Sequence, residues 1–376
     1  MAVVCLIPCD SYDESVTYEA IKKGFELLGG VQKYIHIDGN VLLKPNLLSG
    51  ATPEKAVTTH PAVFGAVAKF LREEGVKNLN YGDSSGVGAP SAEKVVITTG
   101  LEKEAAKYGI THKLFDKSVS VHIENAKVAK NIVLCKDAIE ADSIISLCKM
   151  KTHALETITG ALKNQYGTVY GSQKGLYHAK YPTAGIFGDM IADLNTIIRP
   201  KLFIMDAIVA MEGNGPASGD PVNMNMILMS DDGVALDTVF SELIYLPPEN
   251  VPTTVSAFKA GLGTMRKDEI QIYTPEGIVS VEQAKSKYGN PDFKVSRKKT
   301  HFWNPKATIL TLRRQSEKPV VDLSKCIACG ICEEACPVDE KAVHSGNGQK
   351  AKYDYSKCIR CYCCQEMCPA KAIEKK

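Results

Sequence analysis

Eight cysteines near the end of the 376-residue chain recur in two runs of identical spacing. They follow the pattern C-x2-C-x2-C-x3-C-P, first at Cys326, Cys329, Cys332 and Cys336, then at Cys358, Cys361, Cys364 and Cys368. Thiolates at this spacing hold cuboidal iron–sulfur clusters, and a doubled run is typical of bacterial two-cluster ferredoxins. The spacing therefore predicts two [4Fe–4S] clusters and a chain that handles electrons.

The two runs are expected to share their ligands. In two-cluster ferredoxins the fourth cysteine of each run binds the cluster of the other run, so we assign Cys368 to the first cluster and Cys336 to the second. Zinc is the alternative for C-x2-C pairs, but eight thiolates in two such runs are hard to explain as zinc sites. Cys363, a ninth cysteine inside the second run, is expected to ligate neither cluster.

Composition limits the class of protein. Charged residues make up 23% of the chain and the formal net charge is +2, so no strong field favours nucleic acid or acidic lipid as a partner. The start "MAVVCLIPCDSYDE" lacks a basic region and a small-residue cleavage site, and no apolar run is long enough to span a bilayer. Cysteines concentrated in cluster motifs suit a reducing compartment. These features predict a cytoplasmic protein, and whether identical chains associate is left open.

The remaining chain alternates strand-like and helix-like segments. "ADSIISLCKMKTH" has the apolar run of a buried strand, "THPAVFGAVAKFLREEG" has helical spacing, and "ALETITGALKNQYG" is expected to be a helix. Such alternation predicts an α/β fold with a mostly parallel sheet and flanking helices. We expect this domain over residues 1–300, a linker over 301–319, and a small α+β ferredoxin-like domain over 320–376.

Polar residues cluster where the predicted strands end. Ligands of open α/β sheets bind outside the carboxyl ends of the strands. Any one of these residues is most simply a solvated side chain, but the whole set at one edge suits a site for a carboxylate or phosphate. The residues that we expect to bind such a group are Lys44, Asn46, Asp83, Ser84, Lys149, Lys163 and Asn164.

Two residues of this edge are candidates for catalysis, Lys151 and His153. Nearby cations favour the neutral imidazole, so His153 is expected to act as a base or a hydrogen-bond donor. Asp206 and Glu212 are further candidates to orient hydroxyl groups or accept protons. The run "EGNGPASGDP" that follows is rich in glycine and proline and is expected to form a lid or binding loop.

The segments "LLKPNLL", "HPAVFGAV", "YGDSSG", "CKMKTHALETITGALKNQYG" and "DAIVAMEGNGPASGDP" resemble the family called domain of unknown function 362 over about residues 3 to 300. The resemblance implies an α/β domain and a redox role in anaerobic bacteria or archaea. It also implies electron transfer to a deazaflavin (coenzyme F-420) or a similar carrier. Lys44, Asn46, Asp83, Lys149, Lys151, His153, Lys163 and Asn164 match the motifs and become binding candidates.

Three functions follow as hypotheses. In the first, an iron–sulfur oxidoreductase passes electrons between a soluble ferredoxin, or another redox protein, and an anionic flavin, deazaflavin or substrate. In the second, a reductase acts on a small carboxylated substrate without an organic cofactor. In the third, the chain is a non-catalytic electron-transfer subunit whose α/β domain is a docking scaffold.

Overall fold

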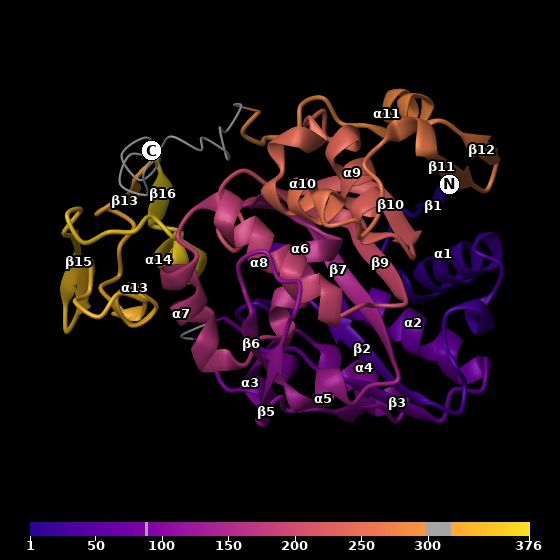
Figure 1. The fold of residues 1–376 in the computed structure, drawn as a ribbon, viewed down its shortest axis with the longest axis horizontal. Helices are drawn as coiled ribbons and strands as arrows, with labels where there is room; N and C mark the ends of the chain where they lie inside the picture. The colour runs from indigo at the N-terminus through magenta and orange to yellow at the C-terminus, as the bar shows by residue number, and fades with distance from the viewer. Residues whose placement is uncertain (87–88, 298–316) are drawn as a thin grey trace.

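The protein is described here from a computed structural model, over residues 1–86, 89–297 and 317–376. Most of the linker predicted at 301–319 lies outside these described residues. The ribbon shows a large α/β body and a small C-terminal module beside it, shown in yellow in Figure 1. Between the body and the module, Figure 1 places helix α7 (Gly171–Lys180).

Ten strands of the described chain form one mixed sheet in the body. Its order is β12-β11-β1-β10-β9-β7-β2-β3-β4, and β8 pairs with the end of β7. Seven strands run in one direction, while β8, β10 and β12 run in the other. The bounds are β1 Ala2–Pro8, β2 Asn40–Pro45, β3 Asn78–Tyr81, β4 Thr111–His112, β7 Ser143–His153, β8 Thr157–Thr159, β9 Leu202–Glu212, β10 Asp220–Ser230, β11 Ile270–Thr274 and β12 Gly277–Val279.

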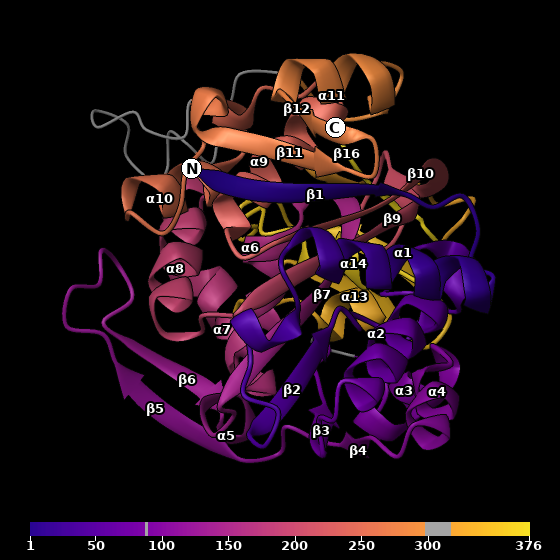
Figure 2. The ribbon, with the colours of Figure 1, turned by 90° about the vertical axis from the view of Figure 1, so that its right-hand side faces the viewer.

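Helices cover both faces of this sheet. In Figure 1 α1 and α2 lie to the right of the central strands and α6, α8, α9 and α10 to the left, and Figure 2 shows α1 and α2 towards the viewer. The bounds in the body are α1 Glu14–Leu27, α2 Pro61–Glu73, α3 Ala92–Thr98, α4 Leu101–Lys107, α5 Lys136–Ile139, α6 Ala161–Asn164, α8 Ala184–Ile197, α9 Gly233–Leu243, α10 Pro252–Lys259 and α11 Val281–Tyr288. A separate hairpin joins β5 (Ser118–His122) to β6 (Asn131–Cys135).

The local sequence explains these elements. Strand β7 is buried along its whole length because helices cover both faces, which is why its first half is rich in apolar residues. Helix α2 begins at Pro61, whose ring suits the first helical position, and the His60 side chain accepts the backbone N–H of Ala62. The predicted fold class, a mostly parallel sheet with flanking helices, is confirmed for the body.

The predicted helix over "ALETITGALKNQYG" is wrong for most of its length. Thr157–Thr159 instead forms β8, antiparallel to the end of β7, and only Ala161–Asn164 is α-helical. The β-branched side chains of Ile158 and Thr159 favour an extended backbone, and Gly160 separates β8 from the helix. The result turns the chain sharply at the carboxyl end of β7.

The C-terminal module is built from short elements. They are β13 Pro319–Val321, α13 Ile331–Glu334, β14 Val343–Gly346, β15 Gln349–Tyr353, α14 Cys363–Glu366 and β16 Ile373–Lys375. Strand β13 pairs with β16, and β14 pairs with β15. Each run of cysteines therefore surrounds one short helix between two strands.

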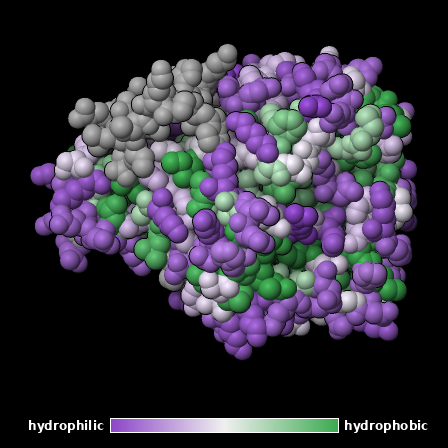
Figure 3. Space-filling model, viewed as in Figure 1, coloured by the Kyte–Doolittle hydropathy of each residue, from purple (hydrophilic) through white to green (hydrophobic). Residues whose placement is uncertain are grey.

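Hydrophilic side chains cover most of the face seen in Figure 3, interrupted by apolar patches. Among the described residues, no helix is both long and apolar enough to cross a bilayer.

Candidate functional site

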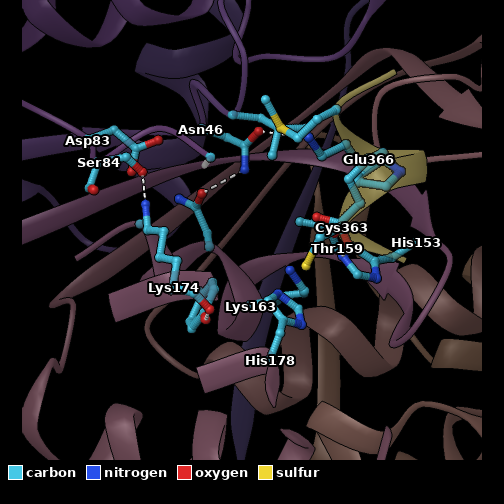
Figure 4. Close-up of a pocket in the computed structure, with 18 of the residues that line it drawn as sticks. Asn46, Asp83, Ser84, His153, Thr159, Lys163, Lys174, His178, Cys363 and Glu366 are labelled. Atoms are coloured by element: carbon cyan, nitrogen blue, oxygen red, sulfur yellow. Dashed lines mark hydrogen bonds and ion pairs between the residues drawn. The ribbon is translucent and has the colours of Figure 1, made fainter. Parts of the chain in front are cut away.

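A cavity of about 70 Å³ lies where the carboxyl ends of the strands meet the C-terminal module. The body supplies residues from the ends of β2, β3 and β7, from β8, and from α6 and α7, and the module closes the cavity with α14. A cavity needs at least about 10–15 Å³ to hold one water molecule, so this space suits several waters or a small organic ion. Figure 4 shows Cys363 and Glu366 of the module beside Lys163 and His153 of the body.

Three lysines line the cavity, and none of them has a carboxylate in ion-pair contact among the described residues. The Lys151 ammonium donates to Asn46 Oδ1 (2.8 Å) and to the Val57 carbonyl (2.6 Å). Lys174 donates to the carbonyls of Ser84 and Ser85. Because an ammonium has three N–H donors, each of the two lysines keeps one for a ligand.

Lys163 is the most available of the three. No hydrogen bond or ion pair to its ammonium is found within the described chain, and the group lies 5.5 Å from the centre of the Tyr166 ring. An ammonium over an aromatic face is attracted by the ring quadrupole, which holds Lys163 without consuming its N–H groups. All three of its donors are therefore available inside the cavity.

Burial makes these cations costly without an anion. Burial, followed by the charge of Lys163, lowers the pKa of Lys151 to about 7. Burial also lowers the pKa of Lys174 to about 8. An anion bound among the ammonium groups would offset this cost, so the cavity is electrostatically suited to a negative ligand.

Two further groups present unused polar atoms. Thr159 Oγ1 and His178 Nδ1 are buried and have no hydrogen-bond partner within the described residues, and both residues line the cavity. Burial lowers the pKa of His178 to about 3, so its ring is neutral. Buried polar groups normally have partners, which indicates that this cavity takes polar atoms from a ligand or water.

His153 connects the body to the module. Its Nδ1 accepts the backbone N–H groups of Leu155 and Glu156, each at 3.1 Å, so the ring proton belongs on Nε2. Nε2 lies 2.9 Å from Oε1 of Glu366 on α14, an electrostatic contact without hydrogen-bond alignment. Burial and then Lys163 lower the pKa of His153 to about 4, so the ring is neutral as expected, with burial as the larger cause.

Supporting contacts hold the α6 turn in place. The Asp237 carboxylate accepts the backbone N–H groups of Ala161 (2.6 Å) and Leu162 (3.1 Å) at the start of this turn. Asn164 bonds to Asn46, whose amide nitrogen donates to Asn164 Oδ1 at 3.1 Å. Asn46 also receives Lys151, so the predicted residues Asn46 and Asn164 orient a cavity lysine.

Two of the predicted lysines lie outside the cavity lining. Lys44 makes a buried ion pair with Asp83 (2.8 Å), and Lys149 makes another with Asp206 (2.7 Å). Asp83 and Ser84 do line the cavity, as do Asn46, Lys163, Asn164, Lys151 and His153. Gly167 packs against the first pair so closely that a Cβ atom there would lie 1.8 Å from Asp83 Oδ1. Asp206 and Glu212 are likewise engaged elsewhere, Glu212 with Lys294 at 3.1 Å.

The glycine-rich run after β9, expected as a lid or binding loop, holds the module. The Gln365 amide donates to the Asn214 carbonyl at 2.9 Å, and the Asn214 amide donates to the Ile373 carbonyl at 2.9 Å. Lys371 donates to the carbonyl of Gly219 at 2.6 Å. Pro216 of the same loop lines the cavity, so docking of the module and closure of the cavity involve the same segment.

The cysteines of the module surround two small cavities. One is lined by Cys326, Cys329, Cys332 and Cys368, and the other by Cys336, Cys358, Cys361 and Cys364. Backbone N–H groups donate to three of the sulfurs: Ala351 to Cys326, Ala342 to Cys336 and Ala372 to Cys368. Four sulfurs around each space, with donors to stabilise thiolates, fit the shared-ligand arrangement of two [4Fe–4S] clusters.

Sequence reasoning missed several lining residues. These are Thr159, Lys174, His178, Cys363 and Glu366. Lys174 and His178 lie on α7, away from the strand ends to which the positional rule applies. Cys363 and Glu366 lie inside the second cysteine run, and no sequence signal shows that α14 packs against the strand ends.

Two family models match the chain. The model described as domain of unknown function (DUF362) matches residues 41–242, and the 4Fe-4S dicluster domain model matches residues 318–369. The second match confirms the ferredoxin-type module and supports iron–sulfur electron transfer. Both agree with the resemblance drawn from the sequence.

The chain is also similar to individual proteins. It is 34% identical to a thylakoid-associated protein of Synechocystis sp. over 260 residues, 69% of this chain and 79% of that protein. Among solved structures, the lactate racemase apoprotein from Thermoanaerobacterium thermosaccharolyticum aligns with a TM-score of 0.36 at 12% identity over 61% of this chain. A protein from Thermotoga maritima aligns with a TM-score of 0.39 at 14% identity over 60% of this chain. The alignments span 54% and 57% of the two solved chains.

Proposed function

The chain belongs to the domain of unknown function 362 family and carries a 4Fe-4S dicluster module. From this premise we propose that it is an iron–sulfur oxidoreductase that acts on a small anionic substrate. The substrate is held in the cavity between body and module. The observation that carries this proposal is the set of cavity lysines without carboxylate partners, next to a helix that also bears a cluster cysteine.

The ligand sets of the clusters belong to the same proposal. Cys326, Cys329, Cys332 and Cys368 would hold one cluster, and Cys336, Cys358, Cys361 and Cys364 the other. When bound, the clusters supply one-electron transfer at potentials that depend on hydrogen bonds and solvent exposure. Helix α14 presents Cys364 to the second set, and Cys363 and Glu366 to the cavity. The second set is therefore the one that adjoins the substrate.

The first set, which contains Cys326, Cys329, Cys332 and Cys368, is the better placed to receive electrons from a partner. Cys329 is exposed, and Ile327 beside it is 64% exposed, so the first set reaches the surface of the module. Exposed apolar side chains next to an exposed cluster ligand suit brief contact with a soluble ferredoxin or another redox protein. The proposed route runs from this edge, through the second set, to the cavity.

The residues of the cavity would have separate roles in binding the substrate and in proton transfer. Lys151, Lys163 and Lys174 would bind the anionic group and stabilise charge that develops during reduction. His153, with its proton on Nε2, is placed to donate or take up a proton beside the substrate. Docking of α14 covers part of the cavity, and less water around the lysines would strengthen each of these electrostatic interactions.

The size of the cavity supports the small-substrate hypothesis over the flavin or deazaflavin hypothesis. A space of about 70 Å³ holds a small carboxylate, whereas the three fused rings of a flavin or deazaflavin need more room. The small-substrate reductase is therefore the better supported reading, and a bound flavin or coenzyme F-420 would require α14 to move. A cytoplasmic location and an anaerobic source stay predictions.

The docking contacts favour a second candidate. Gln365 and Lys371 bond to the loop after β9, and Glu366 occupies part of the lysine-lined cavity. In a non-catalytic electron-transfer subunit, the lysines at the strand ends would serve only to hold the module through these contacts. Such a subunit would bind no small anion, which separates the two candidates.

The test uses protein purified without oxygen and reduced chemically. Small carboxylates, flavins and coenzyme F-420 are added one at a time, and reoxidation of the clusters is followed by absorption. The proposal predicts reoxidation by a small carboxylate that is lost in Lys163→Met while the cluster spectrum is unchanged. Reoxidation by flavin or F-420 alone, or by none of the compounds, would contradict it.

A further inference from the structure

The cavity contains carboxylates of two kinds. Among its lining residues Asp83 and Glu366 carry carboxylates, and Asp83 is neutralised by Lys44 at 2.8 Å. No lysine or arginine of the described chain lies within ion-pair distance of Glu366, whose nearest partner is the neutral ring of His153 at 2.9 Å. Glu366 is therefore an acceptor without a direct ion pair, although Lys163 attracts its charge at longer range.

The two kinds of charge come from different parts of the chain. The cationic groups, Lys151, Lys163 and Lys174, belong to the body, and Glu366 belongs to the module. In Figure 4 Glu366 extends from the module ribbon on the side of His153, and Lys174 lies across the cavity beside Ser84. A bound molecule thus meets hydrogen-bond donors on the body side and an acceptor on the module side.

This asymmetry restricts the ligand. A carboxylate placed among the lysines lies close to Glu366, and two carboxylates in a water-poor space repel each other. A hydroxyl group on the ligand removes the conflict because it donates a hydrogen bond to Glu366. An ammonium group would also donate, but it would be repelled by three lysines. A hydroxyl group is therefore the donor that fits both the lysines of the body and Glu366 of the module.

Resting on the proposed function, we propose that the substrate is a small hydroxycarboxylate whose carboxylate binds the body lysines and whose hydroxyl donates to Glu366. Space for several water-sized groups matches such a molecule of two to four carbons. Glu366 is then the residue that selects hydroxylated anions, and it does so only while the module is docked.

The test compares glycolate, which has the hydroxyl, with acetate, which lacks it, and with glycine, which carries an ammonium. Binding to the oxygen-free holoprotein is measured by isothermal titration calorimetry near pH 6, where Lys151 is charged. We expect glycolate to bind about tenfold or more tighter than acetate, because a hydrogen bond to a charged group is lost in acetate. Glycine should bind more weakly than glycolate.

Two variants assign the preference to Glu366. In Glu366→Ala the ratio between glycolate and acetate should fall to about one, and in Glu366→Gln acetate itself should bind more tightly because the repulsion is removed. A merely structural role would weaken both ligands alike. Glu340→Gln, the same change at a carboxylate that is 79% exposed on the same module, should leave the ratio unchanged.

The outcomes separate the two proposals. If glycolate and acetate bind equally and Lys163→Met weakens both, the anion cavity stands and the selective role of Glu366 is wrong. Tighter binding of glycine than of glycolate also overturns the hydroxyl assignment. If none of the three binds, the proposed function fails together with this inference.

Discussion

Lys149 and Lys151 lie two residues apart on β7 and both are fully buried, yet they belong to two different regions. Lys149 contacts Asp206 at 2.7 Å and Tyr12 Oη at 3.0 Å, inside a closed polar network. Lys151 contacts an amide oxygen and a carbonyl and faces the cavity. The comparison shows that the role of a lysine at a strand end depends on whether a carboxylate neutralises it. A paired lysine supports the fold, and an unpaired one is available to a ligand.

The largest expected effect is a loss of stability when Lys149, the lysine paired with Asp206, is replaced. Lys149→Met would leave Asp206 as a buried charge without its cation, which costs about 3–5 kcal/mol of unfolding free energy. Urea denaturation monitored by circular dichroism measures the change. Lys163→Met is the matched control, since it makes the same replacement at a cavity lysine. Equal destabilisation of the two variants would erase the distinction between the regions.

The cavity side should respond in binding instead of stability. Lys163→Met removes an ammonium without a carboxylate partner, so the unfolding free energy should change by less than about 1 kcal/mol. The affinity for a small carboxylate should fall about tenfold, which corresponds to about 1.4 kcal/mol. Calorimetric titration with glycolate provides the measurement. Unchanged affinity would remove Lys163 from the site.

The pH dependence sharpens the comparison further. Lys151 has its pKa lowered to about 7 and Lys174 to about 8, so both are charged below pH 7 and lose their protons as the pH rises through this range. Anion affinity should therefore be highest below pH 7 and fall by about tenfold per pH unit above it for each coupled proton. Lys151→Arg keeps the positive charge, so the fall in affinity near pH 7 should become smaller in this variant. An affinity that does not change between pH 6 and 9 would contradict the assignment.

The smallest expected effect is at Cys363. Cys364→Ala should cost about half of the bound iron, because it removes one of four ligands from one of two clusters. Cys363→Ala should leave the iron content unchanged, since Cys363 faces the cavity. Iron analysis of both variants decides the matter, and iron loss in Cys363→Ala would make this thiol a ligand.

The sequence was most informative where the chemistry is local. The cluster cysteines follow from spacing within two runs of eleven residues, because three of the four expected ligands of each cluster lie close together in one run. The fold class followed from alternating periodicity in the same way. In contrast, the helix expected at "ALETITGALKNQYG" failed because pairing between β8 and β7 overrode the helical propensity of that segment.

The candidate site was predictable only in part. The positional rule for strand ends identified Asn46, Asp83, Lys151 and His153, which do line the cavity. It could not separate Lys149 from Lys151, because the pairing of Lys149 with Asp206 is a contact between distant segments. Nor could it find Glu366, since docking of α14 on the strand ends has no periodic or motif signal.

The central claim is that a small anion binds in the cavity next to the cluster held by the second set of cysteines. Electron–nuclear double resonance tests it directly on the reduced protein, frozen immediately after ¹³C-labelled glycolate is added and before the clusters are reoxidised. The account predicts a coupling between the ¹³C nuclei and the paramagnetic cluster that disappears in Lys163→Met. A saturating ligand without any such coupling would contradict the account, because it would place the anion away from the clusters.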